Sequence, residues 1–243
     1  MRRKLTYSLL LTLKRGVERL SDEARQQVCH YVMSQRDEIY ETGVAFKNRG
    51  GQADLYYTLF GWMLCYALDI KTDGARRKDY LKTFDAVQLD DLHQTVLTLC
   101  RMLDRLLGLP RFTPDAVLKM MAERPLLQFF KAYQQHGSGG GTNAWAARLV
   151  MASGKDEALV QQLLAVQHES GGFRAYEGAF MPDLLSTAVA LFALSLQQVS
   201  ARYDVQPFIE AHWQKDGSFV ATLLDEYGDV EYVFYGLLAI GSL

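Results

Sequence analysis

Residues 167–173 read QHESGGF, and ten residues after this phenylalanine Asp183 opens an apolar run. Residues 214–219 read QKDGSF, and Asp229 opens a second apolar run at the same distance from its phenylalanine. A glycine-bearing loop that leads into an apolar helix therefore occurs twice, 46 residues apart. Such self-similarity is typical of proteins built from repeated supersecondary units, so the repeat is the main guide to the fold.

Five segments of the chain share the layout of the two copies. Each begins with an acidic or amide residue, has a small or β-branched residue four positions later, and continues with apolar residues. The five starting residues are Asp54, Asp91, Asn143, Asp183 and Asp229. Asp and Asn are preferred helix N-caps, because their side-chain oxygen accepts a backbone N–H of the first turn. The segments that follow are apolar nearly all round, which predicts five inner helices buried on most sides.

Amphipathic segments alternate with the predicted inner helices. They cover residues 4–20, 22–40, 76–86, 115–134, 154–167 and 201–214. One amphipathic outer helix cannot bury an inner helix alone, so neighbouring pairs must pack side by side. Sustained strand alternation is almost absent from the sequence.

The predicted fold is all-α, with about five helical hairpins over residues 22–243 and an N-terminal helix over residues 1–21. The inner helix starts are 37, 52, 40 and 46 residues apart, which favours a closed or curved array over a regular solenoid. The longest interval contains the glycine-rich residues 136–141, which form either a domain linker or a long loop. Because the repeat layout continues through them, we interpret them as a loop within a single domain of residues 1–243.

The pattern Gln-x-x-x-Gly-Gly-Phe, followed by Asp and an apolar helix, resembles the repeat of protein prenyltransferase β subunits and of squalene and terpene cyclases. Residues 167–196 carry it best, residues 214–240 carry a second copy, and residues 35–68 carry a looser third. The resemblance implies an α/α toroid, in which inner helices ring a central cavity and outer helices surround them. The glycines, the phenylalanine and the aspartate of the pattern all have structural roles, so the motif indicates fold more than activity.

The resemblance also implies where catalytic metal and acid groups would lie. Protein prenyltransferases bind zinc through an Asp, a Cys two residues later and a His on the last inner helix. Leu185 and Tyr232 stand at the Cys and His positions here, so we expect no metal and no cofactor. Class II cyclases use an Asp-x-Asp-Asp motif, and neither Asp90 with Asp91 nor Asp225 with Glu226 reproduces it.

In a toroid, the starts of the inner helices gather at one end of the ring. This places Asp54, Asp183 and Asp229 together as candidate catalytic carboxylates. Aromatic and polar residues near the helix starts suit an apolar chamber with a polar rim. The candidate ligand-binding residues are Tyr57, Trp62, Trp145, Arg174, Tyr176, Tyr232 and Tyr235.

Composition and charge limit the classes of partner. Apolar residues make up 49% of the chain and the net charge is −2, which excludes the strongly basic field that nucleic-acid binding needs. Three scattered cysteines fit a reducing compartment, and the apolar run near the N-terminus ends at Lys14 and Arg15 without a cleavage site, so we expect a cytoplasmic protein. The apolar stripe within residues 1–20 either packs on the domain or touches an anionic membrane surface.

Three functions stay open on these observations. The first is a toroid that binds an isoprenoid or other lipid-like molecule, or a partner protein, without catalysis. The second is a prenyltransferase- or cyclase-type enzyme that acts on such a ligand without zinc. The third is a small (α/α) carbohydrate-active enzyme with two carboxylates, such as Asp183 with Asp54 or Glu177.

Overall fold

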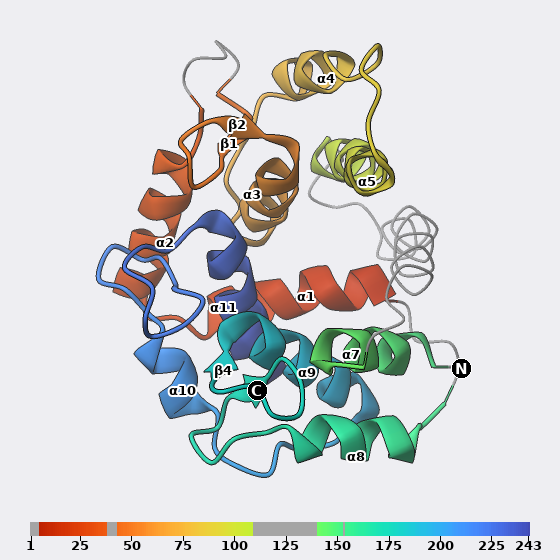
Figure 1. Ribbon diagram of the computed structural model, residues 1–243. Coiled ribbons are helices and arrows are strands. Elements are labelled where there is room, and N and C mark those ends of the chain that lie inside the picture. The colour runs from red at the N-terminus through yellow and green to blue at the C-terminus, as the bar shows by residue number, and fades with distance from the viewer. Residues whose placement is uncertain (1–4, 38–42, 109–139, 153) are drawn as a thin grey trace.

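Outer and inner helices alternate along the chain in the computed structural model, which describes residues 5–37, 43–108, 140–152 and 154–243 (Figure 1). The elements are α1 (Leu5–Glu18), α2 (Asp22–Ser34), β1 (Phe46–Lys47), β2 (Ala53–Asp54), α3 (Leu55–Ala67), α4 (Gly74–Lys82), α5 (Asp91–Leu107), α7 (Thr142–Met151), α8 (Glu157–Ala165), β3 (Phe173–Arg174), β4 (Pro182–Asp183), α9 (Leu184–Gln197), α10 (Gln206–Ala211) and α11 (Val230–Ser242). The all-α prediction is confirmed, while the outer helix predicted over residues 115–134 lies outside the described residues.

The described inner helices follow one another around the centre of the molecule in the order α5, α3, α11, α9 and α7 (Figure 1). Helix α11 packs against α3 as well as α9, so the last unit of the chain lies beside the first. The outer helices α2, α4, α8 and α10 pack against α3, α5, α7 and α11. This arrangement is the α/α toroid that the repeat predicts.

Helix α1 lies against the inner helices α3 and α11 (Figure 1). Its glycine Gly16 packs so closely on α11 that an added Cβ would lie 2.1 Å from the carbonyl oxygen of Leu237. Leu13 and Val17 are buried on the same side of the helix. Packing on the domain is therefore the alternative that the structure supports for α1, and membrane contact through residues 1–20 stays an untested prediction.

The repeated phenylalanine anchors each glycine loop to its inner helix. Phe46, Phe173 and Phe219 are at most 1% exposed. The Phe173 N–H donates to the Thr187 hydroxyl oxygen at 2.8 Å, and the Thr187 hydroxyl donates in turn to the Asp183 carbonyl at 2.7 Å. The N–H of Phe46 makes the corresponding bond to the Thr58 hydroxyl at 3.0 Å. The β-branched residue four positions after the cap thus ties the loop to the helix in two units.

Two short antiparallel ribbons accompany these loops, β1 with β2 and β3 with β4. Each strand has only two residues, too few for the alternation by which strands are recognised in a sequence. Isolated bridges pair Gln167 with Phe173 and Trp213 with Phe219. The structural counterpart of Gln167 is therefore Trp213, one residue before the Gln214 that the sequence pattern aligns with it.

Two glycines of the repeat meet the backbone of the next unit. Gly171 has a φ of 95°, and an added Cβ would lie 2.0 Å from the carbonyl oxygen of Asp204, just before α10. Gly217 has a φ of 89°, and its Cβ would lie 2.4 Å from the carbonyl carbon of Gln27 in α2. Both the backbone conformation and the close approach require glycine.

Three of the five predicted caps are confirmed. Asp54, Asp183 and Asp229 precede α3, α9 and α11, and their side chains accept first-turn N–H groups. The prediction for α5 is wrong by one residue, since Asp90 is the cap and Asp91 the first helical residue.

The cap predicted for α7 is also wrong, because Asn143 lies inside the helix and the cap is Gly141. A neighbouring loop replaces the missing side-chain cap. The N–H of Thr142 donates to the Ala175 carbonyl at 2.8 Å, and the Thr142 hydroxyl donates to the Arg174 carbonyl.

Candidate functional site: the central cavity

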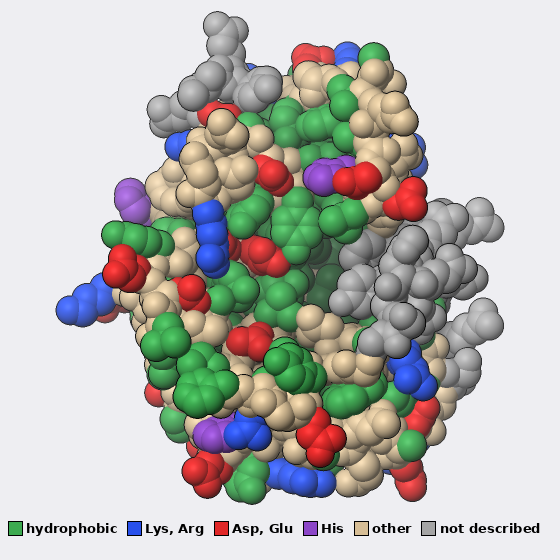
Figure 2. Space-filling model, in the orientation of Figure 1, with side chains coloured by type: hydrophobic (Ala, Val, Ile, Leu, Met, Phe, Trp, Pro, Cys, Tyr) green, Lys and Arg blue, Asp and Glu red, His purple; other side chains and the backbone are tan. Residues whose placement is uncertain are grey.

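A cavity of about 630 Å³ lies inside the ring, bordered by α1, α3, α5, α7, α9 and α11. The face shown in Figure 2 is hollowed at its centre, where hydrophobic side chains gather with acidic side chains around them. A volume of this size is within the range of small-molecule pockets.

The described inner helices line the cavity with the same positions counted from the N-cap, except that the second position of α11 does not border it. These positions are the second (Tyr56, Leu92, Asn143, Leu185), the sixth (Phe60, Val96, Ala147, Val189, Tyr235) and the ninth (Met63, Leu99, Val150, Phe192, Leu238) residues after the cap. At 3.6 residues per turn these positions share one face of a helix. The fourth and seventh positions lie on the opposite face, where Thr58 bonds to the N–H of Phe46 and Gly61 leaves room for its ring. In α3, α9 and α11, one face of the helix therefore holds the loop before it and the other faces the cavity.

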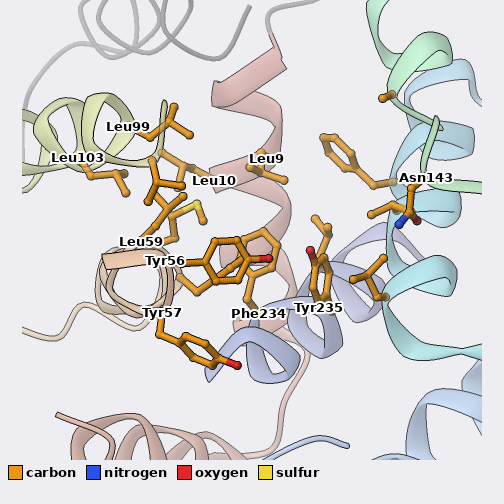
Figure 3. A pocket seen from close by; sticks show the side chains of 18 of the residues that line it. Leu9, Leu10, Tyr56, Tyr57, Leu59, Leu99, Leu103, Asn143, Phe234 and Tyr235 are labelled. Carbon is orange, nitrogen blue, oxygen red and sulfur yellow. The ribbon is translucent and has the colours of Figure 1, made fainter. Parts of the chain in front are cut away.

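Helix α1 closes one side of the cavity with Leu9 and Leu10 (Figure 3). From the opposite direction Tyr56 on α3 and Tyr235 on α11 face each other across the space. Part of the apolar stripe that suggested a membrane contact is thus used in the cavity wall.

The polar groups gather where the inner helices begin. The carboxylate of Asp54 borders the cavity, and its Oδ1 accepts the N–H groups of Tyr56 and Tyr57 at 2.8 and 3.1 Å. The Tyr56 hydroxyl donates to Glu231 Oε1 at 2.8 Å, which joins the start of α3 to the start of α11. Burial raises the pKa of Glu231, and the hydrogen bond from Tyr56 opposes part of that rise.

Asp229 is held by an ion pair across the junction of the first and last units. Its Oδ2 lies 2.7 Å from Arg49 Nε, its Oδ1 accepts the N–H of Tyr232 at 2.9 Å, and its side chain is only 5% exposed. The guanidinium of Arg49 also lies 5.5 Å from the centre of the Tyr232 ring. Oδ2 of Asp229 therefore joins the first unit to the last, while Oδ1 caps α11.

Asp183 bonds within its own helix start. Its Oδ1 accepts the Ser186 N–H at 2.7 Å, and its Oδ2 accepts the Ser186 hydroxyl at 2.8 Å. Burial raises the pKa of Asp183, and the two bonds from Ser186 oppose the rise. Asp183 does not border the cavity.

The three predicted catalytic carboxylates lie at one end of the ring. Their charges act on Tyr57 and Tyr232, which lie between them. Burial, followed by the charges of Asp229 and Glu231, raises the pKa of Tyr57 to about 12, with Asp54 adding a smaller part. Burial also raises the pKa of Tyr232, and Glu231, Asp229 and Asp183 contribute in that order. A catalytic role for any of them stays a prediction.

The predicted ligand-binding residues divide into two groups. Tyr57 and Tyr235 border the cavity, and Tyr232 lies beside Tyr235, with ring centres 6.0 Å apart. The remaining four, Trp62, Trp145, Arg174 and Tyr176, do not border it.

The positions of these four residues explain why they do not reach the cavity. Trp62 is the eighth residue after its cap, is fully buried on the outer side of α3, and donates from Nε1 to the Val44 carbonyl at 2.8 Å. Trp145 is the fourth residue after Gly141, which is again an outward position. Arg174 lies in β3, and Tyr176 is 56% exposed in the loop after it.

Sequence reasoning placed Asn143 among the helix starts but did not select His93 or Glu231 for the site. His93 lies at the third position after its cap and Glu231 at the second, so the helical period could have identified both. Within the described residues, no group of three or more His, Cys, Asp or Glu side chains is placed to hold a metal ion. No described helix is both long and apolar enough to span a bilayer.

The ring of helical hairpins around an apolar cavity defines an α/α toroid. The family model of the prenyltransferase alpha-alpha toroid domain matches residues 113–243. This match covers more than half of the chain, and the chain belongs to that family. A search of curated proteins found no match to the sequence.

Proposed function

We propose that this toroid binds an isoprenoid or other lipid-like molecule, with the apolar part of the ligand inside the central cavity. The observation that carries the proposal is the cavity of about 630 Å³ whose walls are apolar on all six helices that border it. Each methylene group that leaves water for such a space contributes about 0.8 kcal/mol. A chain of several such groups is therefore enough to drive binding.

The apolar walls count against the carbohydrate-active alternative. Sugar hydroxyls buried against leucine, valine and phenylalanine would lose their hydrogen bonds to water without replacement, which costs about 1–3 kcal/mol for each unsatisfied group. Polar side chains border the cavity mainly near the helix starts, as Asp54, Tyr56 and Tyr57 do. This distribution suits a ligand with one polar end.

Catalysis on the same ligand is the second candidate function, and the pair of Glu231 and Tyr56 supports it. Burial raises the pKa of Glu231, which makes its carboxylate a stronger base that can accept a proton from a bound molecule. The test is mass spectrometry of candidate lipids after incubation with the protein. Turnover that Glu231→Gln abolishes while binding persists would establish the enzyme.

The binding proposal is tested by filling the cavity. Val189 borders it at the sixth position of α9, where the equivalent residues of α3 and α11 are Phe60 and Tyr235. Because the scaffold already accepts an aromatic ring at this position, Val189→Phe is expected to fold and to occupy part of the ligand space. Val87→Phe, at a half-exposed residue that does not border the cavity, is the matched control.

Two measurements decide the outcome. Lipid is extracted from the natively purified proteins and quantified by mass spectrometry. It should be present in the unmodified protein and in Val87→Phe, and depleted in Val189→Phe. The affinity for a fluorescent fatty-chain ligand should fall at least about tenfold in Val189→Phe, equal to about 1.4 kcal/mol. If both variants bound the ligand equally well and were equally stable, the ligand would not bind in the cavity and the proposal would be wrong.

A further inference from the structure

The mouth of the cavity lies where the inner helices begin. It carries more negative charge from carboxylates than positive charge from cationic side chains that could bind a ligand. Asp54 borders it, and Glu231 is bonded to Tyr56, which also borders it. Within the described part of the chain, no lysine or arginine borders the cavity, and the histidine that does, His93, is hydrogen-bonded to Asp90 at 2.8 Å. The guanidinium of Arg49 lies near the same tyrosines, but Asp229 holds it at 2.7 Å.

The mouth also offers hydrogen-bond acceptors that need a donor. The side chain of Asn143 borders the cavity opposite the tyrosines (Figure 3), and its Oδ1 is buried without a hydrogen-bond partner in the described structure. The hydroxyl hydrogen of Tyr56 is already donated to Glu231. A ligand that brings its own O–H or N–H would satisfy these acceptors, and a buried acceptor without a donor is costly.

A diphosphate head group fits this mouth poorly. It brings several negative charges and only acceptor oxygens near neutral pH, and proteins bind such groups with arginine, lysine or a bound cation. A like charge beside a carboxylate is repelled, and the repulsion is stronger in a partly buried site than in water. Hydroxyl and ammonium groups avoid this repulsion and donate hydrogen bonds.

We infer that the ligand of this cavity ends in a hydrogen-bond donor without negative charge, an alcohol or an amine, and not in a diphosphate. The inference rests on the proposed function, since it specifies the head group of the molecule proposed to fill the cavity. According to this inference, the ligand of this chain is not a prenyl diphosphate.

The test compares three ligands with the same hydrocarbon chain and different head groups: farnesol, farnesylamine and farnesyl diphosphate. Their affinities are measured by displacement of a fluorescent fatty-chain ligand from the full chain at neutral pH. The alcohol and the amine are expected to bind at least about tenfold more tightly than the diphosphate. Tightest binding by the diphosphate, or equal binding by all three, overturns the head-group inference and leaves the cavity proposal intact. Failure of all three to displace the reporter ligand, or failure of that ligand to bind, removes the proposed function itself.

Two charge-neutralising variants locate the effect. Asp54→Asn keeps a good helix cap, and Glu231→Gln keeps an acceptor for the Tyr56 hydroxyl. Each variant should lower the affinity for the amine relative to the alcohol by several-fold. Each should also reduce the difference in affinity between the alcohol and the diphosphate. Glu226→Gln, at an exposed acidic residue that does not border the cavity, is the control and should leave all three affinities unchanged. An unchanged amine-to-alcohol ratio in both mouth variants would contradict the assignment of the head group to this mouth.

Discussion

The units that end in α9 and α11 share a scaffold and differ in what their helix starts do. Both bury a phenylalanine, place a glycine with positive φ against the next outer helix, and cap the inner helix with aspartate. In the first unit Asp183 bonds to its own Ser186, while in the second Asp229 bonds to Arg49 from the start of the ring. The same motif is thus completed locally in one unit and across the ring in the other.

Three positions at which the two units differ border or adjoin the cavity. At the second, third and sixth positions after the cap, α9 has Leu185, Ser186 and Val189, and α11 has Glu231, Tyr232 and Tyr235. The residues that the units share build the ring, and the residues of α11 at these three positions give its mouth a polar side. Comparing repeats within one chain therefore separates structural positions from candidate functional ones.

The largest predicted effect concerns a glycine that both units use. Gly171→Ala should lower the free energy of unfolding by about 3 kcal/mol or more, because the new Cβ meets the Asp204 carbonyl and the φ of 95° is unfavourable. Gly217→Ala should do the same through Gln27. Gly178→Ala is the control, since Gly178 has a φ of 90° with open space around it, and should cost about 1 kcal/mol. Urea denaturation measures all three, and equal losses would show that the contact between units contributes nothing.

The next effect is expected at the carboxylate that closes the ring. Arg49→Gln should cost about 2 kcal/mol, less than for a fully buried pair because the arginine side chain is half exposed. Ser186→Ala, which removes one bond to Asp183, should cost about 1 kcal/mol. The comparison predicts that the interaction across the ring is worth more than the local one.

A double-mutant cycle with Asp229→Asn isolates that interaction. Asparagine still caps α11 but carries no charge, so Arg49→Gln should add little to its effect on stability. Additive losses in the cycle would show that Arg49 stabilises the protein through other contacts.

A third change converts the α9 unit toward the α11 unit. Thr187 accepts the N–H of Phe173, whereas the equivalent residue of α11 is Val233. Thr187→Val should cost about 1–2 kcal/mol, because it leaves a buried N–H without a partner. Faster hydrogen exchange at the Phe173 amide should accompany the loss. Val233→Thr, the reverse change, should be close to neutral, and a neutral Thr187→Val would show that this bond does not stabilise the loop.

The scaffold could be predicted from the sequence because its causes are local. The glycine, phenylalanine and cap of each unit lie within about 20 residues of one another, and Asp54, Asp183 and Asp229 were identified as caps for that reason. The cap of α7 could not be identified, because Ala175 and Arg174 from another loop satisfy the first turn in place of Asn143.

The site was less predictable for two physical reasons. Trp62 and Trp145 were placed in the chamber by their nearness to a helix start, although counting from the observed caps puts both on the outward face. The bond between Tyr56 and Glu231 joins residues that are 175 positions apart, so no local pattern could show it. The helical period could have corrected the placement of the two tryptophans. The hydrogen bond between Tyr56 and Glu231 becomes visible only when the first and last units are placed side by side.

The smallest effect is expected at His212. This residue is the equivalent of Val166 in the α9 unit, because the carbonyl of each accepts the backbone N–H of the residue after the repeated phenylalanine. Its ring is fully buried, and Nδ1 donates to the Phe208 carbonyl at 2.7 Å. Burial lowers the pKa of His212, with Phe208 and Asp183 opposing the shift. The unfolded chain therefore binds a proton more readily than the folded chain.

Stability should consequently be retained above the unfolded histidine pKa, near 6.5, and be lost as the pH falls through and below that value. One proton limits the slope to about 1.4 kcal/mol per pH unit. His212→Val copies the α9 unit and should flatten this dependence between pH 7 and pH 5, at a constant cost for the lost bond to Phe208. Urea denaturation at several pH values compares the two proteins, with His30→Val as the control. An unchanged slope in His212→Val would mean that another group titrates, and that the two loops do not differ in their response to acid.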